Sequence, residues 1–421
     1  MAELTCMLVG AGIRGLQYVD HASSCDPEFR PVAVAEPDDQ RRNDFADRFG
    51  IPPERRFQTW REAASHGRMA GCVINATRDH LHHASAVALL QHGYDMLLEK
   101  PIAPCREETL DIAETARGHG CKVMICHVLR YTPFYSKVKE ILQSGRLGHI
   151  MEIRMAENVS WHHFATGFVR GRFRNIKEGA PFILAKCCHD TDLMAWFMSG
   201  NPPRRVSSFG SLTYFRPENA PEGATDNCYD CPHIETCPFS AERIYVEGKI
   251  WRFRALTGFT GTSDEEAREA LRRGPYSRCV WRCDNDVVDK QTLSVEFADG
   301  AIGTMNTSGV AARPDREIAV YGTKGELRGS LEDGKLIVRE IEGPGGKYRE
   351  ELIDPRGGSG HELDGHGGGD SRLVADFIDV LRGKGTNRTC IEDSIYGHLI
   401  GYAAEDSRAT REWITVDCLP T

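Results

Sequence analysis

The most constraining feature of the sequence is a glycine pattern near its N-terminus. Leu4–Val9 is a short apolar run typical of a buried strand, and Gly10-Ala11-Gly12-Ile13-Arg14-Gly15 follows where a helical pattern begins. In a G-x-G-x-x-G pattern, the missing side chains allow a tight turn and let a pyrophosphate approach the N-terminus of the helix. We therefore expect a dinucleotide-binding turn whose cofactor contacts are Gly10, Gly12, Ile13, Arg14 and Gly15.

An acidic residue after the second apolar run strengthens this prediction. Residues 31–35 are strand-like and end in Glu36, about 20 residues beyond Gly15. A carboxylate at this place can accept hydrogen bonds from the adenosine ribose and repels the 2′-phosphate of NADP. The sequence favours NAD, whereas Arg41 and Arg42 leave NADP open. The alternative is a turn that packs a helix on a sheet without a ligand.

Strand and helix patterns alternate through the first 130 residues. Helical patterns at 38–49, 80–92 and 106–117 alternate with short apolar runs. Parallel strands need crossover helices, so this alternation predicts an α/β fold with a doubly wound parallel sheet, a Rossmann domain, in residues 1–130.

The pattern changes after residue 148. Alternating stretches at 150–159, 206–215, 293–297, 301–307 and 317–321 favour an antiparallel sheet with one covered face. Asp299-Gly300 and Asp333-Gly334 are two-residue hairpin signals. We expect a second, α+β domain in residues 131–421, with helices at 373–381 and 391–407, the last returning toward the first domain.

Composition restricts partners and compartment. With 61 acidic and 52 basic side chains the net charge is −9, which argues against nucleic-acid binding. No run of about 18 apolar residues and no secretory leader occurs, so we expect no membrane association. The 15 cysteines, an odd number, suit free thiols in a reducing compartment, and we expect a cytoplasmic protein.

Several further motifs indicate a family. Glu99-Lys100-Pro101 follows an apolar run, Asn75-Ala76-Thr77 and His82 precede it, and Arg130-Tyr131-Thr132-Pro133-Phe134 stands at the expected domain junction. Over nearly its whole length the chain resembles the Gfo/Idh/MocA family, named for glucose-fructose oxidoreductase, inositol dehydrogenase and a rhizopine-catabolism protein. The resemblance implies a large open, mainly antiparallel sheet in the second domain, and oxidation or reduction of hydroxyls on sugars, cyclitols and their derivatives with NAD or NADP. The cofactor contacts it implies are Asn75, Thr77, His82, Glu99 and Lys100.

The resemblance also implies a catalytic lysine. Lys100 matches the lysine beside the nicotinamide, where a cation stabilises alkoxide character on the reacting oxygen, and Pro101 is expected to follow a cis peptide. The chain departs from the family pattern twice. Arg78 replaces a proline after Thr77, and Ala185 replaces the aspartate four residues before the family histidine.

His189 matches that histidine and is the expected general base, because an imidazole with a pKa near 6.5 can accept a hydroxyl proton. Lys186 stands three residues earlier, so on a helix both side chains would share a face and point at one hydroxyl. Lys186 is then expected to support the substrate or to lower the pKa of His189, and Asp192 to orient its surroundings. The alternative is a buried histidine that only bonds the backbone. The expected substrate contacts are Lys100, Arg130, Lys186, His189 and His366.

Residues 357–369, with seven glycines, predict a flexible loop that carries His361 and His366. We expect His366 to line the substrate pocket and Asp370 to cap the helix that follows. A plain linker would have a similar sequence.

Three cysteines, Cys228, Cys231 and Cys237, lie in an insertion at about 215–290. Zinc favours four thiolate or imidazole ligands, and His233, Cys279 or Cys283 could complete the set. The sequence leaves two alternatives, a structural zinc site and ordinary buried thiols.

The leading expectation is an NAD-dependent dehydrogenase acting on a secondary hydroxyl of a sugar, glycoside or cyclitol, as a homodimer or homotetramer because an open sheet face must be covered. One alternative is an NAD-dependent glycoside-cleaving enzyme that uses transient oxidation and elimination. The other is a non-catalytic NAD-bound sensor, which Ala185 favours and which Lys100 and His189 argue against.

Overall fold

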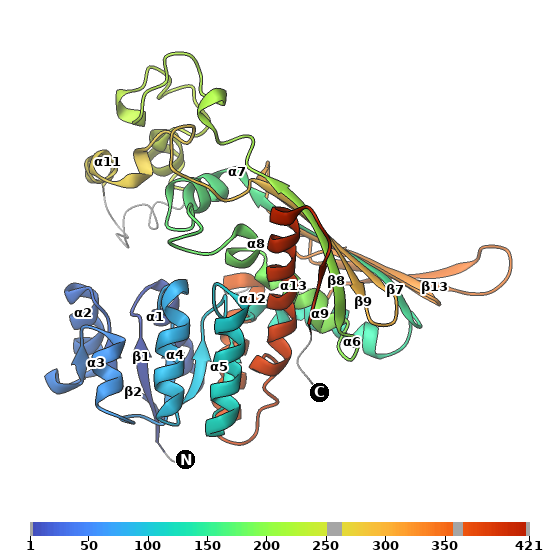
Figure 1. The fold of residues 1–421 in the computed structure, drawn as a ribbon, viewed down its shortest axis with the longest axis horizontal. Helices are drawn as coiled ribbons and strands as arrows, with labels where there is room; N and C mark the ends of the chain where they lie inside the picture. Colours follow the sequence, from blue (N-terminus) through green and yellow to red (C-terminus); the bar gives the residue numbers. More distant parts are fainter. Residues whose placement is uncertain (1–2, 251–262, 357–364, 418–421) are drawn as a thin grey trace.

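Two sheets organise the molecule, and a long helix stands between them (Figure 1). The computed structural model describes residues 3–250, 263–356 and 365–417. His361 and most of the predicted glycine-rich loop therefore lie outside the described residues. Among the described helices, none is long and apolar enough to cross a membrane.

The first sheet is parallel and six-stranded, in the order β3-β2-β1-β4-β5-β6. Its strands are β1 (Leu4–Val9), β2 (Phe29–Ala35), β3 (Arg56–Phe57), β4 (Cys72–Asn75), β5 (Asp95–Leu98) and β6 (Val123–Ile125). The helices between them are α1 (Ile13–Cys25), α2 (Asp39–Phe49), α3 (Trp60–Ser65), α4 (His82–Gln91) and α5 (Arg106–His119). The strand order reverses between β1 and β4, and doubly wound sheets bind ligands at the carboxyl ends of the strands at such a point. The predicted Rossmann fold is confirmed.

The second sheet has nine strands in the order β14-β13-β12-β11-β7-β10-β9-β8-β15. They are β7 (Ile150–Ser160), β8 (Pro203–Ser211), β9 (Lys290–Phe297), β10 (Ile302–Ala311), β11 (Asp315–Gly322), β12 (Gly325–Ser330), β13 (Lys335–Ile341), β14 (Tyr348–Ile353) and β15 (Ile414–Thr415). Only β7 and β10 pair in parallel, so the sheet is mainly antiparallel, as expected. Gly300 and Gly334 turn the β9–β10 and β12–β13 hairpins with φ of +90° and +65°, which glycine adopts without steric cost.

Helices of the second part of the chain pack on one face of this sheet or against the first domain. They are α6 (Pro133–Gln143), α7 (Trp161–Phe164), α8 (Phe182–Ala185), α9 (Cys188–Phe197), α12 (Gly365–Leu381) and α13 (Ile391–Thr410), preceded by the short 3₁₀ turn η3 (Val128–Tyr131). Helix α12 packs on α1 and η3, and α13 packs on α9, β8 and α5.

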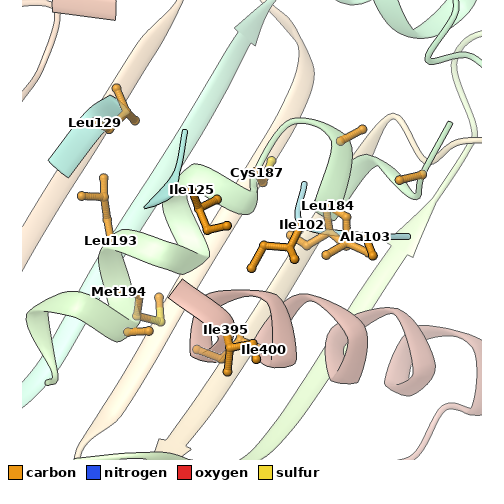
Figure 2. Close-up of a cluster of buried hydrophobic side chains, with 14 of the residues drawn as sticks. Ile102, Ala103, Ile125, Leu129, Leu184, Cys187, Leu193, Met194, Ile395 and Ile400 are labelled. Carbon is orange, nitrogen blue, oxygen red and sulfur yellow. The ribbon is translucent and has the colours of Figure 1, made fainter. Parts of the chain in front are cut away.

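One apolar cluster joins the two sheets. Figure 2 shows Ile102 and Ala103, which follow β5, packed with Leu184 of α8 and with Ile395 and Ile400 of α13. Ile102, Ile395 and Ile400 are fully buried. Because burial of each such side chain contributes about 1.5–3 kcal/mol, this contact holds the loop after β5 in a fixed place against the second sheet.

The insertion has a small core of its own. It carries α11 (Asp264–Arg273), which begins with a capping box between Ser263 and Glu266, and the π-helical turn η7 (Glu242–Glu247). The buried members of this core are Cys228, Ala241, Ile244, Tyr245, Val246, Ala267 and Leu271.

Candidate active site

The glycine-rich turn lies at the switch point between β1 and α1. A Cβ added at Gly10 would lie 2.5 Å from the carbonyl oxygen of Ala76, and one at Gly15 would lie 2.2 Å from the carbonyl oxygen of Gly10. A Cβ at Gly12 would meet no atom within 4 Å. Two glycines are therefore required for packing, and the third leaves open space at the N-terminus of α1, where a pyrophosphate fits.

Glu36 lies against this turn. Its carboxylate accepts hydrogen bonds from the backbone N–H of Ala11 (2.8 Å) and of Asp38 (3.1 Å), and the residue is 6% exposed. The guanidinium of Arg42 donates to the carbonyl oxygen of Glu36 (2.7 Å) and to Asp39. Arg42 is therefore used within the protein, which leaves Arg41 as the cation for the NADP alternative.

The loop after β4 is tied to the lysine loop after β5. Asn75 is fully buried and donates to Ser85 Oγ (2.8 Å), and its amide oxygen accepts from the hydroxyl of Thr77 (3.0 Å). The ring of His82 spans two carbonyl oxygens, that of Pro101 (2.7 Å) and that of Thr77 (3.2 Å). These side chains fix the shape of the predicted cofactor loops, although Arg78 stands where the resemblance implies a proline.

Glu99 and Arg14 form a buried charged pair at the start of α1. Arg14 Nε donates to Glu99 Oε1 (3.0 Å), which also accepts from the hydroxyl of Tyr18 (2.7 Å). The other carboxylate oxygen of Glu99 accepts from the backbone N–H of Lys100 (2.7 Å). Burial alone raises the pKa of Glu99, but Arg14 and Lys100 outweigh it and lower that pKa to about 2. Both residues therefore brace the turn and the lysine loop.

Lys100 reaches across to the second domain. The Lys100–Pro101 peptide is cis, as the resemblance implies, and Lys100 Nζ donates to the carbonyl oxygen of Ala185 (3.1 Å). Ala185 is the position where the resemblance implies an aspartate. A backbone carbonyl thus contacts the ammonium at the position where this chain lacks the carboxylate.

The segment 182–197 is not one helix, which corrects the premise for Lys186. Helix α8 ends at Ala185 and α9 begins at Cys188, so Lys186 and His189 are not i and i+3 on one helix face. Lys186 instead pairs with Glu157 of β7, with 2.9 Å between Nζ and Oε1. The expected helical spacing was wrong because these residues are buried on nearly every side. Their apolar pattern therefore does not reveal where one helix ends and the next begins.

Three charged residues that the sequence did not single out, Glu157, Asp190 and Arg316, complete this network. Arg316 of β11 lies 2.5 Å from Glu157 and 3.0 Å from Asp190, and Glu157 and Asp190 are 3% and 1% exposed. Burial raises the pKa of Asp190 to about 7. The sequence contains one sign of this network. Glu157 continues the alternation of the inward-facing residues Ile153 and Met155, so it is a charged residue on the apolar face of the strand.

His189 lies on α9 and is 5% exposed, and its buried Nδ1 has no hydrogen-bond partner among the described residues. Burial, followed by the charge of Lys100, lowers its pKa well below the usual 6.5. His127, His366 and Arg316 add to this shift. Lys186 is paired with Glu157. The imidazole is therefore neutral at pH 7 and able to accept a proton.

The structure corrects the expected role of Arg130. This residue is fully buried, its guanidinium donates to both carboxylate oxygens of Asp192 (2.7 and 2.6 Å), and it also donates to the carbonyl oxygen of Arg388 (2.8 Å). Arg130 therefore lies in a buried ion pair at the domain junction, whereas we expected it to contact the substrate. Asp192 orients Arg130, in line with its expected role.

His366 lies near His189, with 6.1 Å between the ring centroids. Asp370 does not cap α12 with its side chain as expected, because its carboxylate is held by Arg14 (2.7 Å) and by His366 Nδ1 (3.0 Å). The structure thus brings Lys100, His189 and His366 together at the edge of the first sheet.

The zinc prediction receives no support. Cys228, Cys231, Cys237 and Cys279 line one cavity of the insertion, beside Arg170, whose guanidinium lies 3.4 Å from Cys228 Sγ. Within residues 3–250, 263–356 and 365–417, no group of three or more His, Cys, Asp or Glu side chains is arranged to hold a metal ion. The expectation assumed an insertion without a core, and the apolar cluster around Leu271 supplies one.

Comparison with known proteins places the chain among oxidoreductases. The model of the oxidoreductase family GFO_IDH_MocA, with an NAD-binding Rossmann fold, matches residues 4–127, and the model of the C-terminal alpha/beta domain of that family matches residues 139–416.

Individual relatives are distant. Levoglucosan dehydrogenase from Pseudarthrobacter phenanthrenivorans is 24% identical over 442 residues and covers 99% of each chain. Inositol 2-dehydrogenase from Corynebacterium glutamicum is 26% identical over 195 residues, 45% of this chain and 52% of its own. The solved structure of levoglucosan dehydrogenase with NADH and L-sorbose covers 100% of each chain at 18% identity, and its TM-score of 0.72 shows the same fold.

Proposed function

Because this chain belongs to the Gfo/Idh/MocA oxidoreductase family and carries its NAD-binding Rossmann domain, we propose that it is an NAD-dependent dehydrogenase of a secondary hydroxyl on a sugar, glycoside or cyclitol. That it is an oxidoreductase acting on CH–OH groups follows from the family and from relatives named as sugar and cyclitol dehydrogenases. The choice of NAD over NADP, and the roles of the site residues, are part of the proposal.

One observation carries the proposal. His189 is a buried imidazole whose pKa is lowered first by burial and then by the charge of the nearby Lys100 ammonium. Alcohol oxidation needs a base for the hydroxyl proton and a positive charge for the oxygen that loses it. These two side chains, held by separate domains, supply both.

The residues divide the chemistry as follows. NAD bound at the glycine-rich turn would supply the acceptor for the hydride that leaves the carbinol carbon. Gly12 leaves room for the pyrophosphate, and Glu36 accepts hydrogen bonds from the ribose. His189 takes the hydroxyl proton, and Lys100 stabilises the developing alkoxide. In this proposal, Lys186, which pairs with Glu157, contacts a second polar group of the substrate.

The test is a screen of the purified protein with NAD and a panel of polyols, sugars and aryl glycosides. NADH absorbance and released aglycone are followed together, with Lys100→Met as the background control. Dehydrogenase activity predicts NADH in proportion to product and no aglycone. Aglycone release without net NADH would instead establish the glycoside-cleaving alternative, and a protein that binds NADH but turns over no compound of the panel would favour the sensor.

Two further points belong to the proposal. We take residues 1–130 as the cofactor domain and 131–421 as the substrate domain. We also expect a homodimer or homotetramer, because the second sheet exposes large apolar side chains, among them Phe209 (70%), Ile341 (63%) and Leu352 (64%). The cytoplasm is the compartment that we expect. Light scattering on the purified protein tests the assembly.

A further inference from the structure

The proposed base is almost completely buried. His189 is 5% exposed, and the rings nearest to it besides His366 belong to the fully buried His127. Oxidation of an alcohol R₂CHOH sends a hydride from carbon to NAD and a proton from oxygen to His189, so each turnover leaves one proton on this imidazole. Its lowered pKa makes that proton unstable there. The proton must reach solvent before the next turnover.

His366 has the placement that such an exit requires. Its ring centroid lies 6.1 Å from that of His189, and its side chain is 40% exposed, so the imidazole faces both the buried base and solvent. Its Nδ1 lies 3.0 Å from Asp370 Oδ2. A carboxylate on Nδ1 holds the proton on that nitrogen and leaves Nε2 as the free acceptor.

Contacts with the surrounding residues fix the positions of His366 and Asp370. Asp370 is 1% exposed and also accepts from Arg14 on the cofactor helix α1, at 2.7 and 3.2 Å. His366 has φ of +49°, a left-handed conformation that is uncommon for any residue other than glycine and persists where the surroundings fix it. Gly369 lies so close to η3 that an added Cβ would be 2.2 Å from the carbonyl oxygen of Val128.

We propose that His366 relays the proton from His189 to solvent and that Asp370 is the positioning residue that sets its tautomer. The relay rests on the proposed dehydrogenase function. In the oxidative direction, His189 passes the substrate proton through one bridging water to Nε2 of His366, because the 6.1 Å between the ring centroids is too long for a direct hydrogen bond. Nδ1 keeps its proton on the Asp370 side, and the imidazolium then releases the Nε2 proton to water or buffer. In the reductive direction the same path supplies a proton to the alkoxide.

Among the described residues, the groups that face His366 come from four elements. They are Asp370 on α12, Arg14 on α1, Arg316 on β11 and His189 on α9. Burial and the two arginines lower the pKa of His366, while Asp370 raises it. The opposing effects suit a group that accepts and releases one proton per turnover.

Chemical rescue is the first test. His366→Ala should lose roughly 10²-fold in kcat, because a relay is a general acid–base role. Added imidazole should restore kcat in proportion to its concentration, whereas the kcat of the wild-type enzyme should not respond. The matched control is His83→Ala, which removes another histidine–aspartate pair, with Asp111 at 2.6 Å, on the far helices α4 and α5. This variant should keep wild-type kcat.

The second test does not use activity. Nitrogen NMR of histidine-labelled protein without substrate should show His366 protonated at Nδ1, and Asp370→Asn should convert part of it to the Nε2-protonated form. Asp370→Asn also covers the case in which His366→Ala fails to fold.

The outcomes are distinct. A wild-type protein that reduces no NAD with any compound of the panel refutes the dehydrogenase function and the relay together. An active wild-type enzyme whose His366→Ala variant keeps its kcat, or loses it without any response to imidazole, refutes the relay alone. An Nε2-protonated His366 in the wild type refutes the role of Asp370.

Discussion

Glu36 is the residue through which the cofactor turn can distinguish the two dinucleotides. Its buried carboxylate would lie against a 2′-phosphate, and like charges in such contact cost several kcal/mol. Glu36→Ser should therefore lower the ratio of kcat/KM for NAD to that for NADP by about 10- to 100-fold, at 1.4 kcal/mol per factor of ten. Steady-state kinetics with both cofactors measure this ratio, and Asp44→Ser, an exposed acid of α2, is the control. An unchanged ratio would remove Glu36 from cofactor selection.

The lowered pKa of His189 leads to a second prediction about a single residue. Burial and Lys100 lower its pKa below 6.5, and the base is active when neutral, so activity is present above the lowered pKa and lost as pH falls through it. The acidic limb of kcat/KM for alcohol oxidation should lie below pH 6.5. Lys186→Met should leave that limb in place, since Glu157 already neutralises this lysine. A limb at or above 6.5 would contradict the assignment.

A candidate site residue could be identified from the sequence where it belongs to a local motif. Lys100 and Glu36 stand directly after strands, and His189 follows from the resemblance. Arg130 was misplaced because its position near the junction did not reveal that Asp192, 62 residues away, uses its donors. Glu157 and Arg316 meet through the pairing of β7 with β11, which no local pattern encodes.

The secondary-structure elements followed the sequence best where their period was regular. Helices α2, α4 and α5 lie within a few residues of their predicted ranges, because each has one apolar face against the parallel sheet. The parallel pairing of β7 with β10 could not be predicted, since these strands are far apart in the chain and the alternation along each strand is the same for either direction.

The insertion should depend on its own core. Leu271 is 1% exposed on α11 and packs with Ile244 and Tyr245. Leu271→Ala should destabilise this segment by about 2–5 kcal/mol through lost burial and a cavity. Limited proteolysis should then cut the insertion faster than in the wild type, while Glu265→Ala, on the exposed side of the same helix, should leave the rate unchanged. Equal cleavage rates for Leu271→Ala and wild type would show that the cluster does not hold the insertion.

At the scale of the whole molecule, the Arg130–Asp192 pair links η3 to α9 between the two domains. Both side chains are 1% exposed, so removal of one partner leaves a buried charge unpaired. Asp192→Ala should lower the free energy of unfolding by about 3–5 kcal/mol, measured by denaturant unfolding. Glu140→Ala, in the exposed pair with Lys137, should change it little. A similarly small loss for Asp192→Ala would contradict a structural role for this pair.

Across the two domains, the central claim is that His189 takes the substrate proton while Lys100 stabilises the oxygen. Single-turnover formation of NADH from the best substrate of the panel, in wild type and in His189→Ala, tests this claim most directly. The variant should form NADH roughly 10²- to 10⁴-fold more slowly and bind NADH as tightly as the wild type, because the cofactor turn is untouched. The exposed His119→Ala should match the wild type. Near-normal NADH formation by His189→Ala would contradict the claim.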